Sequence, residues 1–115
     1  MKLPDQIPIR LRNVALFLPQ FDDGEGAWLQ VDAVAVIESL KGTTVSISDV
    51  VILHGTPGGY IPSDSALSVE RFHNEPDTDY AERSRSLALD FIRDCETANN
   101  ETVFALTFSL WKDAA

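Results

Sequence analysis

The amino-acid sequence predicts an α+β fold, in which a mainly antiparallel β-sheet of four to five strands packs against one long helix in the C-terminal half. Three observations predict it. Apolar segments with strand-like alternation fill the first half of the chain, residues 77–98 repeat apolar side chains at helical spacing, and residues 102–111 read as a further strand. Strands first, a helix late and a strand last are typical of this class. A chain of 115 residues supports one core, so we expect a single domain over residues 1–115.

The first predicted strand covers residues 7–18. Its apolar side chains alternate with period two, but the alternation changes face near Arg12, which a β-bulge would explain. Residues 19–26 are polar and contain two glycines, so they should form a hairpin loop. The next run, residues 28–38, has one fully apolar face and is also predicted to be a strand.

A turn at Lys41 and Gly42 then leads into residues 43–53, which are rich in β-branched side chains and should complete a second hairpin. The alternation changes face again near Ser48. Glycine and proline fill residues 55–65, which are therefore expected to be a surface loop, and residues 66–72 could form a short edge strand.

The predicted helix runs from about Asp77 to Ala98, because its apolar residues, Leu87 among them, form a single stripe that is expected to be buried. Asp79 and Glu82 have the spacing of a capping box, and Asn99 is suited to end the helix. On its outer face, three pairs have the spacing of intrahelical ion pairs, namely Asp79 with Arg83, Glu82 with Arg85, and Arg93 with Glu96. Leu89 lies about 140° from the centre of the stripe, so it is expected on the solvent side.

The last strand, residues 102–111, carries large apolar residues on one face and mostly small or apolar residues on the other. Two covered faces indicate either a central strand or an oligomer interface. Trp111 and Leu89 are the candidates for such an interface, in a possible homodimer.

The net charge of −9 bears on the kind of partner. An acidic protein repels phosphate backbones and anionic headgroups, so we expect neither direct nucleic-acid binding nor membrane binding. Residues 64–101 hold ten acidic residues against four arginines, which concentrates the negative charge in one part of the chain. Such a surface can steer a basic protein surface into contact.

Two acidic clusters are the candidate contacts with that partner. The first lies in the predicted hairpin loop and the second at the start of the predicted helix, with Tyr60 as an aromatic that could supply buried area. The candidate residues are Asp22, Asp23, Glu25, Tyr60, Glu75, Asp77, Asp79 and Glu82. Both clusters also have a structural explanation, since acid-rich loops are commonly solvated and carboxylates stabilise helix N-termini.

Catalytic chemistry has a weak basis in this sequence. The segment from Leu53 to Gly59 resembles the strand-to-loop segment of α/β-hydrolases, whose turn donates backbone N–H groups to an oxyanion, but no Gly-x-Ser-x-Gly elbow follows it. Cys95 could pair with His54 or His73, although its place on the apolar stripe favours a core cysteine. The acidic loop lacks the ligand spacing of a calcium site. We therefore expect no catalytic residues, no metal and no cofactor.

The sequence leads to three hypotheses. The first is a non-catalytic acidic protein-binding module, for example an inhibitor, immunity or adaptor protein that docks on a basic surface. The second is a structural or assembly protein that works as a homo-oligomer, and the third is a small hydrolase-like enzyme using the turn at His54 and Gly55. One cysteine and no long N-terminal apolar run indicate a cytoplasmic protein.

Overall fold

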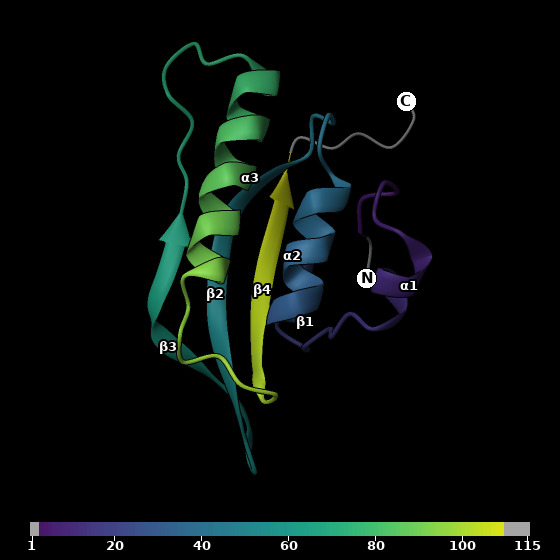
Figure 1. Cartoon of the computed structure of the whole chain (residues 1–115), viewed down its shortest axis with the longest axis vertical. Helices are drawn as coiled ribbons and strands as arrows, with labels where there is room; N and C mark the ends of the chain where they lie inside the picture. Colours follow the sequence, from purple (N-terminus) through teal and green to yellow (C-terminus); the bar gives the residue numbers. More distant parts are fainter. Residues whose placement is uncertain (1–2, 110–115) are drawn as a thin grey trace.

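The computed structural model describes residues 3–109 and has the predicted α+β class (Figure 1). Four antiparallel strands form the sheet, and a helix of 17 residues packs against it. The elements are α1 (Ile9–Asn13), β1 (Glu25–Leu29), α2 (Gln30–Ser39), β2 (Ser46–Thr56), β3 (Gly59–Ser68), α3 (Asp77–Arg93) and β4 (Thr102–Ser109).

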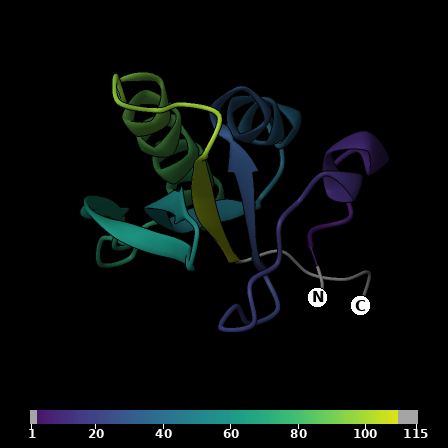
Figure 2. The same ribbon diagram turned by 90° about the horizontal axis from the view of Figure 1, so that it is seen from below.

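The strand order is β1-β4-β2-β3, so the last strand lies inside the sheet. Each helix crosses from one strand to a strand two places away, α2 from β1 to β2 and α3 from β3 to β4. Both crossings run over the same face, and Figure 2 shows the two helices side by side above the sheet. The main core lies between these two layers and includes Trp28, Phe104 and Leu106.

A second, smaller cluster covers part of the opposite face of the sheet. There Leu16, Leu18 and Phe21, from the segment that precedes β1, pack against residues such as Ala105 and Val103 of β4. Thus β4 is buried on both sides within one chain. Its two apolar faces, which the sequence could assign either to a central strand or to an oligomer interface, are explained by the central position.

The prediction for residues 7–18 was wrong, because these residues contain the short helix α1. Ile7 and Leu11 are both buried, while Ile9 between them is exposed, and this spacing of four is helical. Only Leu16 takes part in sheet pairing, in an isolated bridge to Ala27.

The strand predicted over residues 28–38 was also wrong beyond Leu29, because α2 begins at Gln30. As a consequence, β2 pairs with β3 and β4, and the second hairpin predicted from residues 28–53 does not form. Within β2, the change of face expected near Ser48 is confirmed as a register shift between Ile47 and Asp49.

Residues 55–65 are not the expected loop. They contain a tight turn, closed by a 2.7 Å hydrogen bond from the Thr56 hydroxyl to the Gly59 carbonyl, and most of β3. Pro62 is accepted there because β3 is an edge strand, where proline does not interrupt pairing on both sides. The predicted edge strand at residues 66–72 is correct only for its first three residues.

Helix α3 starts at Asp77 as predicted but ends at Arg93. Its N-cap is Pro76, with no side-chain cap, so the predicted capping box is absent. The C-terminus is held by Gln30 of α2, whose side-chain amide donates to the carbonyls of Ile92, at 2.8 Å, and Cys95, at 3.1 Å. This contact from a distant element lies at the end of the helix, whereas Asn99 lies six residues beyond Arg93 and does not end it.

Candidate protein-docking face

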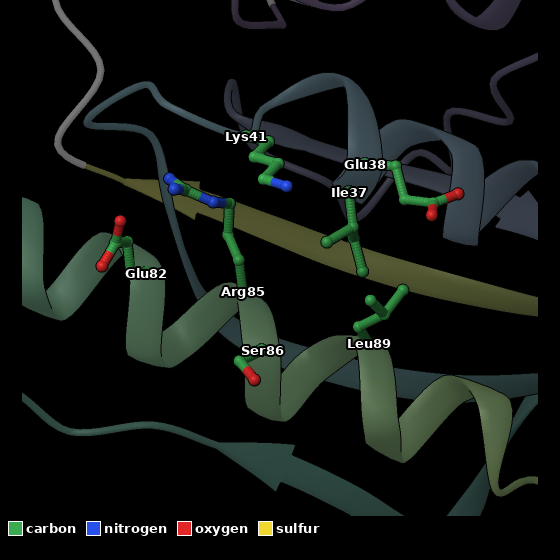
Figure 3. Close-up of a pocket in the computed structure, with 7 residues that line it drawn as sticks. All are labelled: Ile37, Glu38, Lys41, Glu82, Arg85, Ser86 and Leu89. Atoms are coloured by element: carbon green, nitrogen blue, oxygen red, sulfur yellow. The ribbon is translucent and has the colours of Figure 1, made fainter.

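The outer surface of the helical layer is hollowed between α2 and α3 into a groove of about 380 Å³ (Figure 3). Ile37 of α2 and Leu89 of α3 point toward one another across it. Glu38, Glu82 and Lys41 stand around this apolar floor. An open groove with an apolar floor and a charged rim suits contact with protein side chains.

Leu89 is thus not on the solvent side as predicted. It is half-buried and packs against the main core, whereas Leu87, which the sequence placed on the buried stripe, is exposed. The buried face of α3 is rotated because α2 lies beside it and covers the flank that bears Leu89. Trp111, the other residue assigned to an oligomer interface, lies outside the described residues.

Arg85 lines the same groove but is fixed by the protein itself. Its side chain is buried, and Nη1 donates to the carbonyls of Thr43, at 2.8 Å, and Val45, at 2.6 Å. Burial lowers the pKa of this guanidinium, and the charge of nearby Glu82 acts in the opposite direction. Arg85 therefore ties α3 to the turn before β2, and the ion pair with Glu82 predicted from spacing does not form within the described residues.

The carboxylates of α3 differ in whether the chain neutralises them. Asp79, Glu82 and Asp90, with Asp94 just after the helix, are exposed and have no ion-pair partner among the described residues. Arg93 pairs with Glu38 of α2 instead of the predicted Glu96. We call Asp79, Glu82, Asp90 and Asp94 the acidic face of α3.

Two members of the predicted cluster are neutralised internally. Glu75 binds Arg83 through both carboxylate oxygens, and its side chain is only 9% exposed. This hydrogen bonding to Arg83 lowers the pKa of Glu75 from 4.5 to about 2. Asp77 pairs with Arg71 at 2.7 Å. The expected exposed patch from Glu75 to Glu82 is therefore reduced to its free carboxylates, Asp79 and Glu82.

The other predicted cluster does not join this surface. Asp22 and Asp23 are exposed, and Glu25 accepts a hydrogen bond from the backbone N–H of Asp22 at 3.2 Å. Their loop belongs to the segment that lies under the sheet, opposite the helices (Figure 2). Tyr60 also packs on that opposite face, half-buried at the hairpin between β2 and β3. The structure thus separates the predicted partner-binding residues into distinct surfaces.

The residues considered for catalysis are engaged in structural contacts. The N–H of Gly55 donates to the carbonyl of Glu101 at 2.8 Å, so it is used within the fold rather than directed at a substrate oxygen. His54 lies 3.3 Å from the hydroxyl of Thr102, and Cys95 contacts that of Thr97. Within residues 3–109, no three potential ligands gather to hold a metal ion, and none of the helices is both long and apolar enough to cross a membrane.

Sequence reasoning missed the role of the loop between β3 and α3. Arg83 was assigned to Asp79, four residues earlier, but the loop folds back and brings Glu75 to it. Phe72 was considered only as the end of the predicted edge strand and not as a binding residue, although a large apolar residue within a polar stretch is a signal visible in the sequence. In the structure it is exposed and lies over Arg83, 3.9 Å from its guanidinium carbon to the ring centroid.

A comparison with protein families finds one match of functional interest. The model of a family described as Immunity protein 40 matches residues 17–108, a span that includes α2, α3 and the whole sheet except the last residue of β4. No curated protein and no solved structure matches the chain.

Proposed function

The chain belongs to the immunity protein 40 family, and we propose that it is a non-catalytic inhibitor that docks the acidic face of α3 on a basic surface of a protein toxin. Membership of an immunity family supports a role in protein binding. The partner's basic character is the further step, and it follows from the charges of this chain.

The observation that supports this step is the set of free carboxylates on α3. Arg83 and Arg71 neutralise Glu75 and Asp77, but Asp79, Glu82, Asp90 and Asp94 have no counter-ion among the described residues. Four exposed carboxylates on one helix and its end, in a chain of net charge −9, attract a basic surface and raise its rate of association.

The second hypothesis, a homo-oligomeric assembly protein, is no longer supported by its main argument. It relied on the two apolar faces of the last strand, and β4 is covered on both faces by elements of its own chain. The hydrolase hypothesis rested on His54 and the turn that begins at Gly55, but the N–H of Gly55 donates to the carbonyl of Glu101 and the His54 ring lies against the hydroxyl of Thr102. We therefore retain the inhibitor, and we place it in the cytoplasm as part of the same proposal, since Cys95 is a free thiol.

The test begins by identifying the toxin. Proteins of the native host that bind the immobilised chain at low salt are released by denaturation, identified and expressed individually in a laboratory bacterium. A captured protein that arrests growth is the candidate toxin, and it is then expressed again together with this chain.

Affinity for the purified toxin is then measured as a function of salt. Between about 50 and 500 mM NaCl we expect the affinity to fall at least tenfold, because surface charges are screened over shorter distances as salt rises. Failure to relieve growth arrest, or an affinity that does not change with salt, would contradict the proposal.

A further inference from the structure

The loop between β3 and α3 holds an exposed aromatic residue in a fixed position. Phe72 is 62% exposed, yet the Arg83 guanidinium lies over its ring at 3.9 Å from the centroid. Figure 1 shows this loop at the end of the molecule where α3 begins. Stacking of this kind favours one orientation of the ring.

The backbone of the loop is fixed as well. Arg83 binds both carboxylate oxygens of Glu75, at 2.9 and 2.8 Å, and donates to the carbonyl of Glu70 at 2.7 Å. Glu75 in turn accepts the backbone N–H of Phe72 at 3.0 Å. At the start of the loop, the Tyr80 hydroxyl donates to the carbonyl of Val69 at 2.6 Å. We call the bonds that join Arg83 to Glu75 and Glu70, and Glu75 to Phe72, the Arg83 clamp.

The helix extends the surface on which Phe72 lies. Leu87 follows Arg83 by one turn on the same side of α3 and is 42% exposed. Asp79 precedes Arg83 by one turn, and Asp90 follows Leu87 by three residues, which is again one turn along the same side. Phe72, Arg83 and Leu87 therefore form a strip with a large apolar content that has free carboxylates at both ends. An apolar centre with a charged border is the arrangement of protein interfaces.

A fixed aromatic side chain is also energetically suited to binding. A side chain that is already ordered loses little conformational entropy when a partner covers it. A few residues provide most of the free energy at protein interfaces, and aromatic residues and arginine are enriched among interface residues. In this chain the Arg83 clamp holds the ring of Phe72 in one orientation, and the exposed ring provides apolar surface that a partner can bury.

We propose that Phe72, with Arg83 and Leu87, forms the centre of the contact with the toxin, and that Glu75 acts as a positioning residue that holds Phe72 in its binding orientation. The proposal rests on the proposed function. The partner surface it requires is an apolar depression bordered by lysine or arginine, complementary to Asp79 and Asp90.

The direct test measures the affinity of the purified toxin for Phe72→Ala and Leu87→Ala by calorimetry. For Phe72→Ala we expect a dissociation constant at least about 30-fold higher, the loss typical of a central interface residue, and for Leu87→Ala about tenfold. The matched controls are Ile61→Ala and Ile9→Ala, which remove exposed apolar side chains from β3 and α1. They should stay within about threefold of the wild type. Circular dichroism melts establish that each variant is folded.

The role of Glu75 is tested with a double-mutant cycle. Glu75→Gln should slow association with the toxin in the wild-type background, because the ring is no longer held in place. In the Phe72→Ala background the same change should have only the small effect of removing one negative charge, since there is no ring to position. An equal effect in both backgrounds would mean a general structural role and would overturn the assignment of Glu75.

The outcomes separate this inference from the proposed function. If the wild-type chain binds the toxin with the expected salt dependence, but Phe72→Ala and Leu87→Ala bind like the controls, the inference is overturned and the proposed function stands. If the wild-type chain relieves no growth arrest, both fail.

Discussion

Arg85 of α3 donates a hydrogen bond of 2.6 Å to the carbonyl of Val45, forty residues earlier in the sequence. The same nitrogen donates to the carbonyl of Thr43 at 2.8 Å. Because the guanidinium is buried, these two bonds fix the long helix to the turn that leads into β2. Arg85, although charged and in the middle of α3, thus helps to join the helical layer to the sheet.

Replacing Arg85 by methionine should destabilise the protein by about 2–3 kcal/mol. Methionine retains an unbranched apolar stem, but both carbonyls lose a charged hydrogen-bond donor in a buried place. Urea denaturation followed by circular dichroism measures the change. Arg93→Met is the matched control, because it makes the same replacement on the same helix but breaks only the exposed pair with Glu38. That variant should lose less than about 1 kcal/mol, and equal losses in the two variants would contradict the role given to Arg85.

The ion pair between Glu75 and Arg83 should make stability depend on pH in the acid range. In the folded protein the pKa of Glu75 is lowered from 4.5 to about 2, chiefly by hydrogen bonding to Arg83. A lowered folded-state pKa means that the stabilisation is fully present above pH 4.5 and is lost as the pH falls toward 2. Wild type should therefore exceed Glu75→Gln in melting temperature at neutral pH, and the gap should narrow below pH 4.5.

The measurement is a series of thermal melts of both proteins at several pH values between neutrality and the acid limit of folding. Asp23→Asn serves as the control, because it removes one exposed carboxylate from a loop on the opposite side of the sheet. If the difference in melting temperature between wild type and Glu75→Gln stays constant from neutrality to the acid limit, the ion pair does not stabilise the fold.

Trp28 links α1 to the sheet, and its replacement by phenylalanine should be costly. The indole nitrogen donates to the carbonyl of Leu11 at 2.8 Å, and the ring packs edge-on against Phe108. Phenylalanine leaves that carbonyl without its donor and leaves a cavity, so we expect a loss of about 2–4 kcal/mol in the free energy of unfolding. Urea denaturation followed by circular dichroism checks this, with Phe17→Leu at a partly exposed site as the control. A loss no larger than the control's would contradict the bridging role.

The sequence predicted the fold class from its most regular elements, α3 and β4, and misassigned α2. In residues 28–38 eight of the eleven positions are apolar, so alternation and helical spacing fit equally well. The structure buries Ala33, Val36, Ile37 and Leu40, which is the helical spacing, and leaves Val31 exposed. The alanines favoured a helix and the β-branched residues a strand, and packing against β4 and α3 settled the conflict.

The candidate site was predictable only where it depends on local spacing. Asp79 and Glu82 could be placed on an exposed helix face from the sequence alone. The Arg83 clamp could not be predicted in this way. Arg83 can pair with either Asp79 or Glu75, and the path of the loop determines which of these ion pairs forms. Likewise, nothing in the sequence showed that the loop with Asp22 and Asp23 lies on the other side of the sheet.

That separation of the two acidic clusters leads to the last prediction. The double variant Asp79→Asn/Glu82→Gln should weaken binding to the toxin about tenfold or more and reduce its dependence on salt, because both carboxylates are free on the proposed docking face. The double variant Asp22→Asn/Asp23→Asn removes the same charge from the opposite side of the sheet.

Long-range attraction depends on net charge, so the second variant should slow association slightly but leave the dissociation rate unchanged. The first should change both rates, because its residues touch the partner. Surface plasmon resonance at low and high salt separates the two effects. If the loop variant proved the more damaging of the two, the docking surface would lie under the sheet and not on α3.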